Sequence, residues 1–153
     1  MSNQTYIDGY LGQMSEVLSQ LPKVDIDAAI ELLFDAWKAG GTVFIAGNGG
    51  SSSTASHFAC DLAKWTLSEG KPRFRVMALT DNMPLFSALM NDEGTAYVYS
   101  EQIEPFIKEG DVLILISVHG GSGAGNAGSW SQNLLRQLRV HAVSALYSYS
   151  NSK

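Results

Sequence analysis

The spacing of apolar residues over the first forty positions predicts two helices. Apolar side chains recur every three or four residues over 7–21, and the following proline interrupts the pattern. A second run of this kind, over 30–37, ends at Gly40-Gly41, where a glycine can supply the left-handed residue that terminates a helix. Asp25 or Asp27 is the predicted N-cap of this second helix.

From Thr42 onward the apolar residues form short continuous runs, which are typical of strands covered on both faces. Helix-length segments separate these runs, so the predicted fold is α/β: a three-layer open parallel sheet of the flavodoxin-like kind, preceded by the N-terminal helical pair. The predicted strands are 42–46, 74–79, 112–117 and 140–147. The predicted helices are 52–66, 84–91, 97–107 and 129–139, and Pro105 should kink the third of these or end it early.

The length of 153 residues fits one domain. We expect N-terminal helices over 1–41, the α/β core over 42–147 and a polar tail over 148–153. Because the tail has no helical pattern, the last strand lacks the helix that should cover it. The sequence therefore predicts a C-terminus that is truncated or divergent.

Composition narrows the function classes. The chain has 10 Lys and Arg against 15 Asp and Glu, a net charge of −5, and no basic cluster, which disfavours nucleic acid as a partner. One cysteine cannot form an internal disulfide, and no apolar run is long enough to span a membrane. We therefore expect a cytoplasmic protein that acts on a small molecule, with neither nucleic acid nor membrane as a partner.

Eight of the fifteen glycines lie in two windows, 47–50 and 120–128, each directly after a predicted strand. In open α/β sheets such loops lie at the ligand-binding edge, where bare backbone N–H groups can approach an anion. The first window is neither a dinucleotide fingerprint, because position 52 is serine, nor a phosphate-binding P-loop, because no Gly-Lys-Ser/Thr follows. An ordinary turn with a serine N-cap is the alternative. Two such windows favour a phosphate-bearing ligand.

The predicted helix after the first window brings His57 and Asp61 together, because they lie one turn apart on one face. An imidazole and a carboxylate in this arrangement can ligate zinc, or the carboxylate can act as a proton-transfer base. The alternative is a pair of exposed surface residues. Asp81, Asn91 and Asp92 are either contacts for substrate hydroxyls or turn and cap residues.

At this point the residues resemble a known family. The run FIAGNGGSSSTASHFACDL, with MNDEG and GDVLILIS followed by a Ser/Gly loop, resembles the SIS (sugar isomerase) domain, and specifically its phosphoheptose isomerase branch, over about residues 5 to 139. The resemblance implies interconversion of sedoheptulose 7-phosphate and an aldoheptose 7-phosphate through an enediol. It also implies a cytoplasmic homotetramer or dimer. The alternative is a non-catalytic SIS module that binds a sugar phosphate or a protein partner such as a replication initiator.

The resemblance also implies roles for individual residues. His57 matches a zinc ligand, and Asp61 stands where the family has a Glu that contacts the metal and moves the proton. His119 is a hypothetical second acid/base, while the family's C-terminal Gln and His, half of its metal and acid/base set, have no counterpart here. The implied substrate-binding residues are Asn48, Gly49, Gly50, Ser51, Asn91, Asp92, Ser117, Val118, His119 and Ser122.

Overall fold

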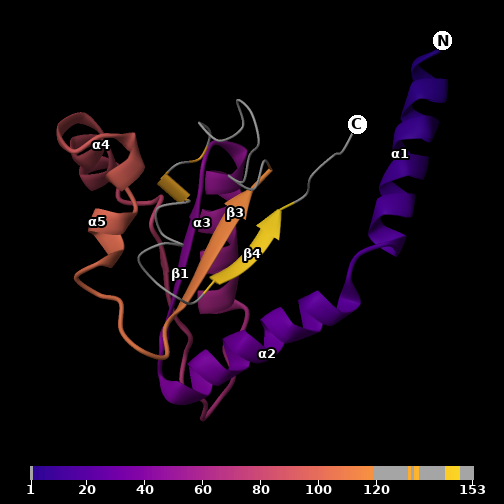
Figure 1. Cartoon of the computed structure of the whole chain (residues 1–153). Helices are drawn as coiled ribbons and strands as arrows, with labels where there is room; N and C mark the ends of the chain where they lie inside the picture. The colour runs from indigo at the N-terminus through magenta and orange to yellow at the C-terminus, as the bar shows by residue number, and fades with distance from the viewer. Residues whose placement is uncertain (1, 119–130, 132, 135–143, 149–153) are drawn as a thin grey trace. The chain divides into compact units, whose positions relative to one another are not determined.

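A computed structural model describes residues 2–118, 131, 133–134 and 144–148 of the chain (Figure 1). The chain divides into two compact units, Met1–Glu31 and Leu32–Lys153. The helices are α1 (Asn3–Ser19), α2 (Lys23–Ala39), α3 (Gly50–Lys64), α4 (Met83–Asp92), the 3-10 turn η1 (Thr95–Tyr97) and α5 (Ser100–Ile103). The strands are β1 (Thr42–Gly47), β2 (Arg75–Ala78), β3 (Val112–Ser117) and β4 (Ser144–Ser148). No helix among the described residues is long and apolar enough to cross a membrane.

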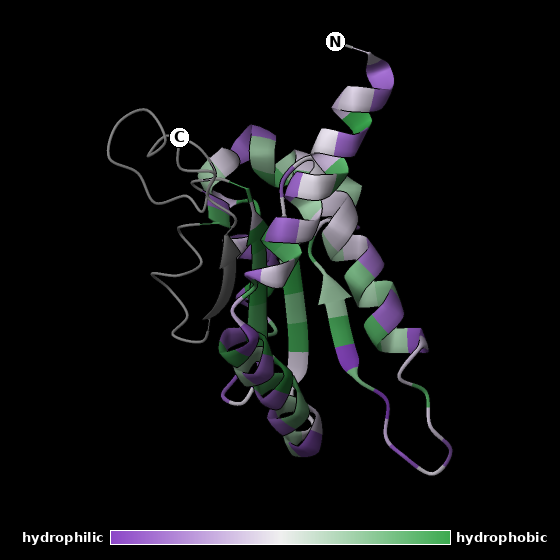
Figure 2. Cartoon of the chain, turned by 90° about the vertical axis from the view of Figure 1, so that its right-hand side faces the viewer, coloured by the Kyte–Doolittle hydropathy of each residue, from purple (hydrophilic) through white to green (hydrophobic). Residues whose placement is uncertain are grey.

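The first unit contains α1, whose N-cap is Ser2: its side-chain oxygen accepts a hydrogen bond of 3.1 Å from the backbone N–H of Thr5. The predicted helical pattern is confirmed, but none of the residues of α1 is buried. Figure 2 shows hydrophobic residues recurring among hydrophilic ones along this helix. The apolar stripe of α1 is therefore open in the single chain.

The second predicted helix is present as α2, but it begins earlier than expected. It starts at Lys23, so neither Asp25 nor Asp27 is its N-cap. Instead, the carbonyl of Pro22 accepts hydrogen bonds from the N–H groups of Asp25 and Ile26, at 3.0 and 3.1 Å. Asp25 lies inside the first turn, where the positive end of the helix dipole favours a carboxylate. The predicted end is confirmed, because Gly40 has a φ of 68°.

The four strands form one parallel sheet in the order β2-β1-β3-β4, which confirms the predicted open α/β architecture. In the central strand β1 successive side chains enter different layers. Phe44 and Ala46 pack with residues of α5 and the segment before it, whereas Val43 and Ile45 pack with α3 and the last turns of α2 (Figure 1). Both faces of β1 are therefore buried, which explains its uninterrupted apolar sequence.

The remaining predicted elements differ in detail. The helices expected at 52–66 and 84–91 correspond to α3 and α4. The helix expected over 97–107 is divided into η1 and the short α5, so a single helix is wrong there, but the predicted early end at Pro105 is confirmed because α5 ends at Ile103. The strand expected over 140–147 is present as β4, which begins at Ser144. The helix expected over 129–139 lies almost wholly outside the described residues.

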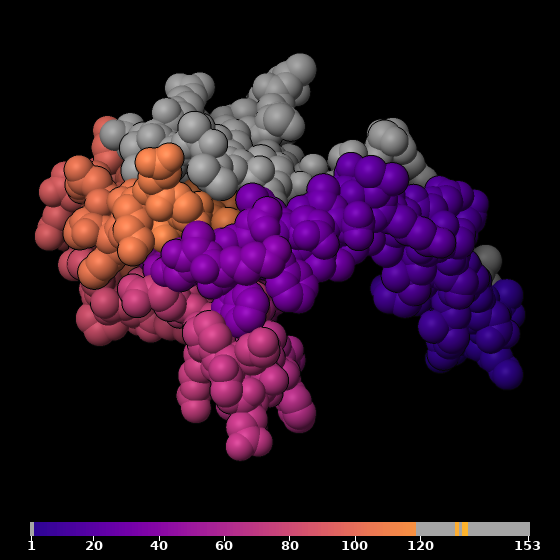
Figure 3. All heavy atoms as spheres, turned by 90° about the horizontal axis from the view of Figure 1, so that it is seen from below, coloured from indigo at the N-terminus to yellow at the C-terminus, as the bar shows by residue number. Residues whose placement is uncertain are grey.

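The connection between α3 and β2 is a surface segment. Residues 65–73 are all exposed and project from the molecule (Figure 3). One anchor is the indole N–H of Trp37, which donates a hydrogen bond of 2.9 Å to the carbonyl of Pro72. The ring of Trp37 also lies 6.2 Å from that of Phe74, measured between centroids. The segment is thus held at its C-terminal end, where β2 is about to begin.

A buried carboxylate fixes the amino-terminal edge of the sheet. Asp111, 3% exposed, accepts a hydrogen bond of 2.7 Å from the N–H of Thr42 through one oxygen, and one of 2.9 Å from the N–H of Lys108 through the other. Gly41 lies so close to this turn that an added Cβ would be 2.3 Å from the carbonyl oxygen of Gly110. Asp111 therefore joins the start of β1 to the turn that leads into β3.

Replacing Asp111 by alanine should destabilise the protein by about 2 to 4 kcal/mol, because two part-buried N–H groups lose their charged acceptor. Urea unfolding followed by circular dichroism measures the change. Glu109→Ala is the matched control, since Glu109 is exposed on the same turn and its loss should cost less than about 0.5 kcal/mol. Equal stability of the two variants would contradict the role given to Asp111.

Candidate anion-binding site at the carboxyl edge of the sheet

The turn from β1 into α3 requires glycine at two positions. At Gly47 an added Cβ would lie 2.5 Å from the carbonyl oxygen of Ser51, so the strand end and the helix start approach too closely for any side chain. Gly49 has a φ of 55°, in the left-handed region that other residues rarely adopt. The first glycine window therefore has a defined backbone path rather than a merely flexible one.

This path leaves two backbone N–H groups open at the start of α3. The N–H groups of Ser51 and Ser52 are used within the turn, donating to the carbonyls of Asn48 and Gly49 at 3.0 Å each. Those of Gly49 and Gly50, both exposed, have no acceptor among the residues that the structure describes. They lie at the positive end of a 15-residue helix. An anion placed there would receive two hydrogen bonds and a favourable dipole.

Asn48 is held by two residues from other parts of the chain. Its amide and that of Asn133 form a reciprocal pair, with N···O distances of 3.0 and 2.8 Å. The hydroxyl of Tyr99 donates to the carbonyl of Gly47 at 2.5 Å and lies 3.3 Å from Oδ1 of Asn48. Burial raises the pKa of Tyr99 from its ordinary value of 10.0 to about 12, so the hydroxyl remains a donor at neutral pH.

The sequence reasoning missed both Tyr99 and Asn133. Tyr99 lies within a segment interpreted only as a helix, and an aromatic residue there has the pattern of an ordinary core side chain. Asn133 lies within the helix predicted at 129–139. No local signal in the sequence identifies either residue, because a polar side chain's need for a partner becomes visible only when the fold shows that it is buried.

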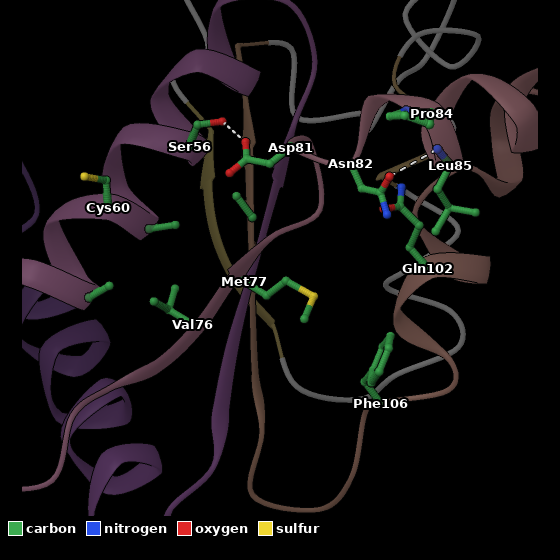
Figure 4. A pocket seen from close by; sticks show the side chains of 13 residues that line it. Ser56, Cys60, Val76, Met77, Asp81, Asn82, Pro84, Leu85, Gln102 and Phe106 are labelled. Carbon is green, nitrogen blue, oxygen red and sulfur yellow. Dashed lines mark hydrogen bonds between the residues drawn. The ribbon is translucent and has the colours of Figure 1, made fainter.

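A cluster of two hydroxyls and a carboxylate lies just beyond the carboxyl end of β2. The hydroxyl of Ser56 donates to the carboxylate of Asp81, and the hydroxyls of Ser56 and Thr80 lie 3.1 Å apart. These contacts border a pocket of about 820 Å³ that runs along the edge of β2, with Cys60 and Met77 in its wall (Figure 4). Of the candidate contacts for substrate hydroxyls, Asp81 lines this pocket, whereas Asn91 and Asp92 do not, nor do the residues of the first glycine window.

His57 and Asp61 do meet on α3, as their spacing predicted. Nε2 of His57 lies 3.4 Å from Oδ2 of Asp61, and the side chains are 77% and 45% exposed. Zinc sites in proteins use three or four protein ligands. No group of three His, Cys, Asp or Glu side chains that could hold a metal occurs among the described residues. His57 and Asp61 alone therefore do not make a zinc site.

Of the other predicted site residues, two lie at the sheet edge that carries the first glycine window, two lie at the end of α4, and two are outside the described residues. Ser117 ends β3 and the exposed Val118 follows it, at the same sheet edge as the first glycine window because Gly47 pairs with Ile116. Asn91 and Asp92 lie at the end of α4, where the side-chain amide of Asn91 donates a hydrogen bond of 2.6 Å to the carboxylate of Asp92. His119 and Ser122 lie outside the described residues.

Taken together, the fold and this edge define an open parallel α/β protein whose candidate ligand site is a glycine-rich loop at the carboxyl ends of β1 and β3. The sequence matches the SIS domain family over residues 6–127. The chain therefore belongs to the SIS domain family.

Two relatives illustrate the sequence similarity. The chain is 49% identical over 115 residues to the lincomycin biosynthesis protein LmbN of Streptomyces lincolnensis, covering 75% of this chain and 42% of LmbN. It is 40% identical over 125 residues to the phosphoheptose isomerase of Proteus mirabilis, covering 78% of this chain and 64% of that enzyme. The chain thus spans less than two thirds of the length of either relative.

Two solved structures share the fold. The phosphoheptose isomerase of Francisella tularensis superimposes with a TM-score of 0.76, covering 97% of this chain and 75% of that one. The enzyme of Neisseria gonorrhoeae gives a TM-score of 0.70, with 96% and 74% covered. Sequence identity is 23% in both cases, so these similarities establish the fold.

The raised pKa of Tyr99 predicts an alkaline loss of stability. The unfolded chain releases this proton at about pH 10 and the folded one at about pH 12, so stability should fall between these values. Tyr99→Phe has no hydroxyl to titrate, so it should not show this loss of stability. The difference in urea midpoint between the wild type and Tyr99→Phe should therefore shrink as the pH rises from about 9 to about 12. Tyr6→Phe, at an exposed position, should retain the wild-type pH dependence. A difference in urea midpoint that stays constant across this pH range would contradict the raised pKa of Tyr99.

Proposed function

We propose that the chain is a sugar-phosphate isomerase of the phosphoheptose isomerase type, which interconverts sedoheptulose 7-phosphate and an aldoheptose 7-phosphate. The observation that carries the proposal is the pair of open N–H groups of Gly49 and Gly50 at the start of α3. It occurs in a chain 40% identical to a phosphoheptose isomerase. In this proposal the phosphate binds these two amides, with the hydroxyls of Ser51 and Ser117 beside it.

The reaction removes a proton from the carbon beside a carbonyl and returns it to the neighbouring carbon, so it needs a base and an acid away from the phosphate. His57 lies seven residues after Gly50 on α3, which is about 10 Å along the helix axis. We assign the base to Asp61, whose carboxylate is held by His57 at 3.4 Å. His119 is the proposed acid, and Asn91 and Asp92 are the proposed contacts for sugar hydroxyls.

His57 and Asp61 are also the residues with which this chain would contribute to a zinc site, as the family resemblance implies. Zinc would stabilise the negative charge that develops on the substrate oxygen. Because the described residues supply only two ligands, no proton transfer is assigned to the metal.

A second candidate function is a SIS module that binds a sugar phosphate, or a protein partner, without catalysis. The exposure of His57 and Asp61 favours it, because acid–base groups usually act in sites from which water is excluded. In that case the glycine window would still bind the phosphate.

An isomerase assay separates the two functions. With sedoheptulose 7-phosphate as substrate, the purified chain should form an aldose, and Asp61→Asn should lower kcat by about 100-fold or more because the base is lost while the side chain keeps its size. Asp35→Asn, at an exposed carboxylate on α2, is the control and should leave kcat unchanged. Parallel assays with added zinc and with a chelator report whether a metal contributes. Substrate binding without turnover under either condition would favour the non-catalytic module.

We also propose that copies of this chain assemble through α1. Five apolar side chains form one stripe along the helix, and each is about half exposed: Ile7, Tyr10, Leu11, Met14 and Leu18. A helix with such a stripe is normally covered by another apolar surface. A second copy presents the same stripe, so the two can cover each other in a symmetric contact.

Sedimentation velocity tests this assembly. Wild type should sediment as a dimer or tetramer, and Leu11→Arg should shift it toward monomer because a charge enters the apolar contact. Glu16→Gln changes the charge by the same amount on the opposite side of α1 and should have little effect. A monomeric wild type, or equal effects of the two variants, would refute assembly through this stripe.

A further inference from the structure

The geometry points to a positioning role for Tyr99 and Asn133: they fix Asn48, and through it the first glycine window, so that the N–H groups of Gly49 and Gly50 face a phosphate. This inference rests on the part of the proposed function that places a phosphate at these amides. It does not depend on whether the chain isomerises a sugar.

Nearly all the hydrogen-bonding groups of the Asn48 side chain are occupied by neighbouring residues. A carboxamide has one oxygen with two lone pairs and two N–H donors. The oxygen accepts from Nδ2 of Asn133 at 2.8 Å and lies 3.3 Å from the hydroxyl of Tyr99. One N–H donates to Oδ1 of Asn133 at 3.0 Å. At most one side-chain hydrogen of Asn48 remains for a ligand, so this residue acts mainly as a bridge.

Asn133 joins the first glycine window to a segment far along the chain. It is 85 positions from Asn48 and 9% exposed, and it follows the second window along the chain. Its Oδ1 also accepts from the N–H of Leu134 at 3.1 Å, which fixes the side-chain oxygen. Ser131, just before it, has a φ of 56°, a conformation that a non-glycine residue keeps only where its surroundings hold it. The backbone at this point is therefore set by its contacts.

Tyr99 fixes the other side of the same turn. It is 1% exposed, and its ring packs against that of Phe86 at a centroid distance of 5.8 Å. Because the ring is held in the core, the hydroxyl reaches the carbonyl of Gly47, the last residue of β1, from a fixed direction. The residues before and within the glycine window are thus held by a side chain anchored in the core.

These contacts matter because glycine has no side chain to limit its backbone conformations. An added Cβ at Gly49 or Gly50 would meet nothing within 4 Å, so no side-chain packing holds these two residues in place. A free glycine backbone populates many conformations, and ordering it upon binding lowers affinity. The contacts of Tyr99 and Asn133 order the turn before the ligand arrives, which is why their loss should appear in phosphate affinity.

The test uses inorganic phosphate as the probe and the full chain. Backbone ¹⁵N–¹H spectra should show the Gly49 and Gly50 amides shifting as phosphate is added. Tyr99→Phe and Asn133→Leu each remove hydrogen bonds but keep size, so each should weaken phosphate binding by about 5- to 10-fold. At saturating phosphate their Gly49 and Gly50 shifts should return to the wild-type positions, because the lost restraint affects ordering rather than the bound geometry.

Three controls separate positioning from general destabilisation. Tyr6→Phe and Asn3→Leu repeat the same chemical changes at exposed positions and should leave phosphate affinity unchanged. Asp111→Ala removes a buried carboxylate at the amino-terminal edge of the sheet, at the opposite end of β1 from the glycine window. It should lower the urea midpoint without changing phosphate affinity.

Each outcome decides the matter. Selective weakening in Tyr99→Phe and Asn133→Leu supports the positioning role. Unchanged affinity in both, an equal loss in Asp111→Ala, or wild-type Gly49 and Gly50 amides that do not respond to phosphate overturns it. A chain that shows the selective weakening but does not isomerise sedoheptulose 7-phosphate would refute the proposed function and leave this inference intact.

Discussion

The parallel pairing of β1 with β3 is the interaction on which the candidate site depends. Both strands are buried between layers of helices, so their relative register is fixed by packing as well as by hydrogen bonds. The carboxylate of Asp111 ties the start of β1 to the turn before β3. Because that register is fixed, β1 and β3 leave the sheet at one edge, at Gly47 and Ser117.

The sequence predicted the layers of this fold well and their boundaries less well, for physical reasons. Continuous apolar runs such as VLILIS have few alternatives to a doubly covered strand, so β1 and β3 were found. The start of α2 was misplaced because the carbonyl of Pro22 performs the capping that was assigned to an aspartate side chain. The helix expected over 97–107 does not continue to 107 because Pro105 has no backbone N–H to donate, and α5 therefore ends at Ile103.

The candidate site was only partly predictable from the sequence. Glycine content located the turn, and helical spacing brought His57 to Asp61, because both signals are local. The bonds from Tyr99 and Asn133 to Asn48 join positions 51 and 85 residues apart, and nothing local marks a tyrosine or an asparagine for such a partner. Contacts of this kind become visible only when the fold has brought the strands' carboxyl ends together.

These contacts also change how the motif around Asn48 should be interpreted. A polar residue within a glycine-rich loop is readily taken for a ligand contact, yet here its carboxamide is occupied by Asn133 and lies beside Tyr99. The groups left open are the backbone N–H groups of Gly49 and Gly50, which every residue except proline possesses. The chemistry of the loop therefore resides in its backbone, and its side chains matter chiefly through the conformation that they impose. Under the proposed function, the rest of the sugar phosphate would be recognised by residues outside the loop. His57 and Asp61 lie further along α3, as a ligand with its phosphate and reacting carbon apart would require.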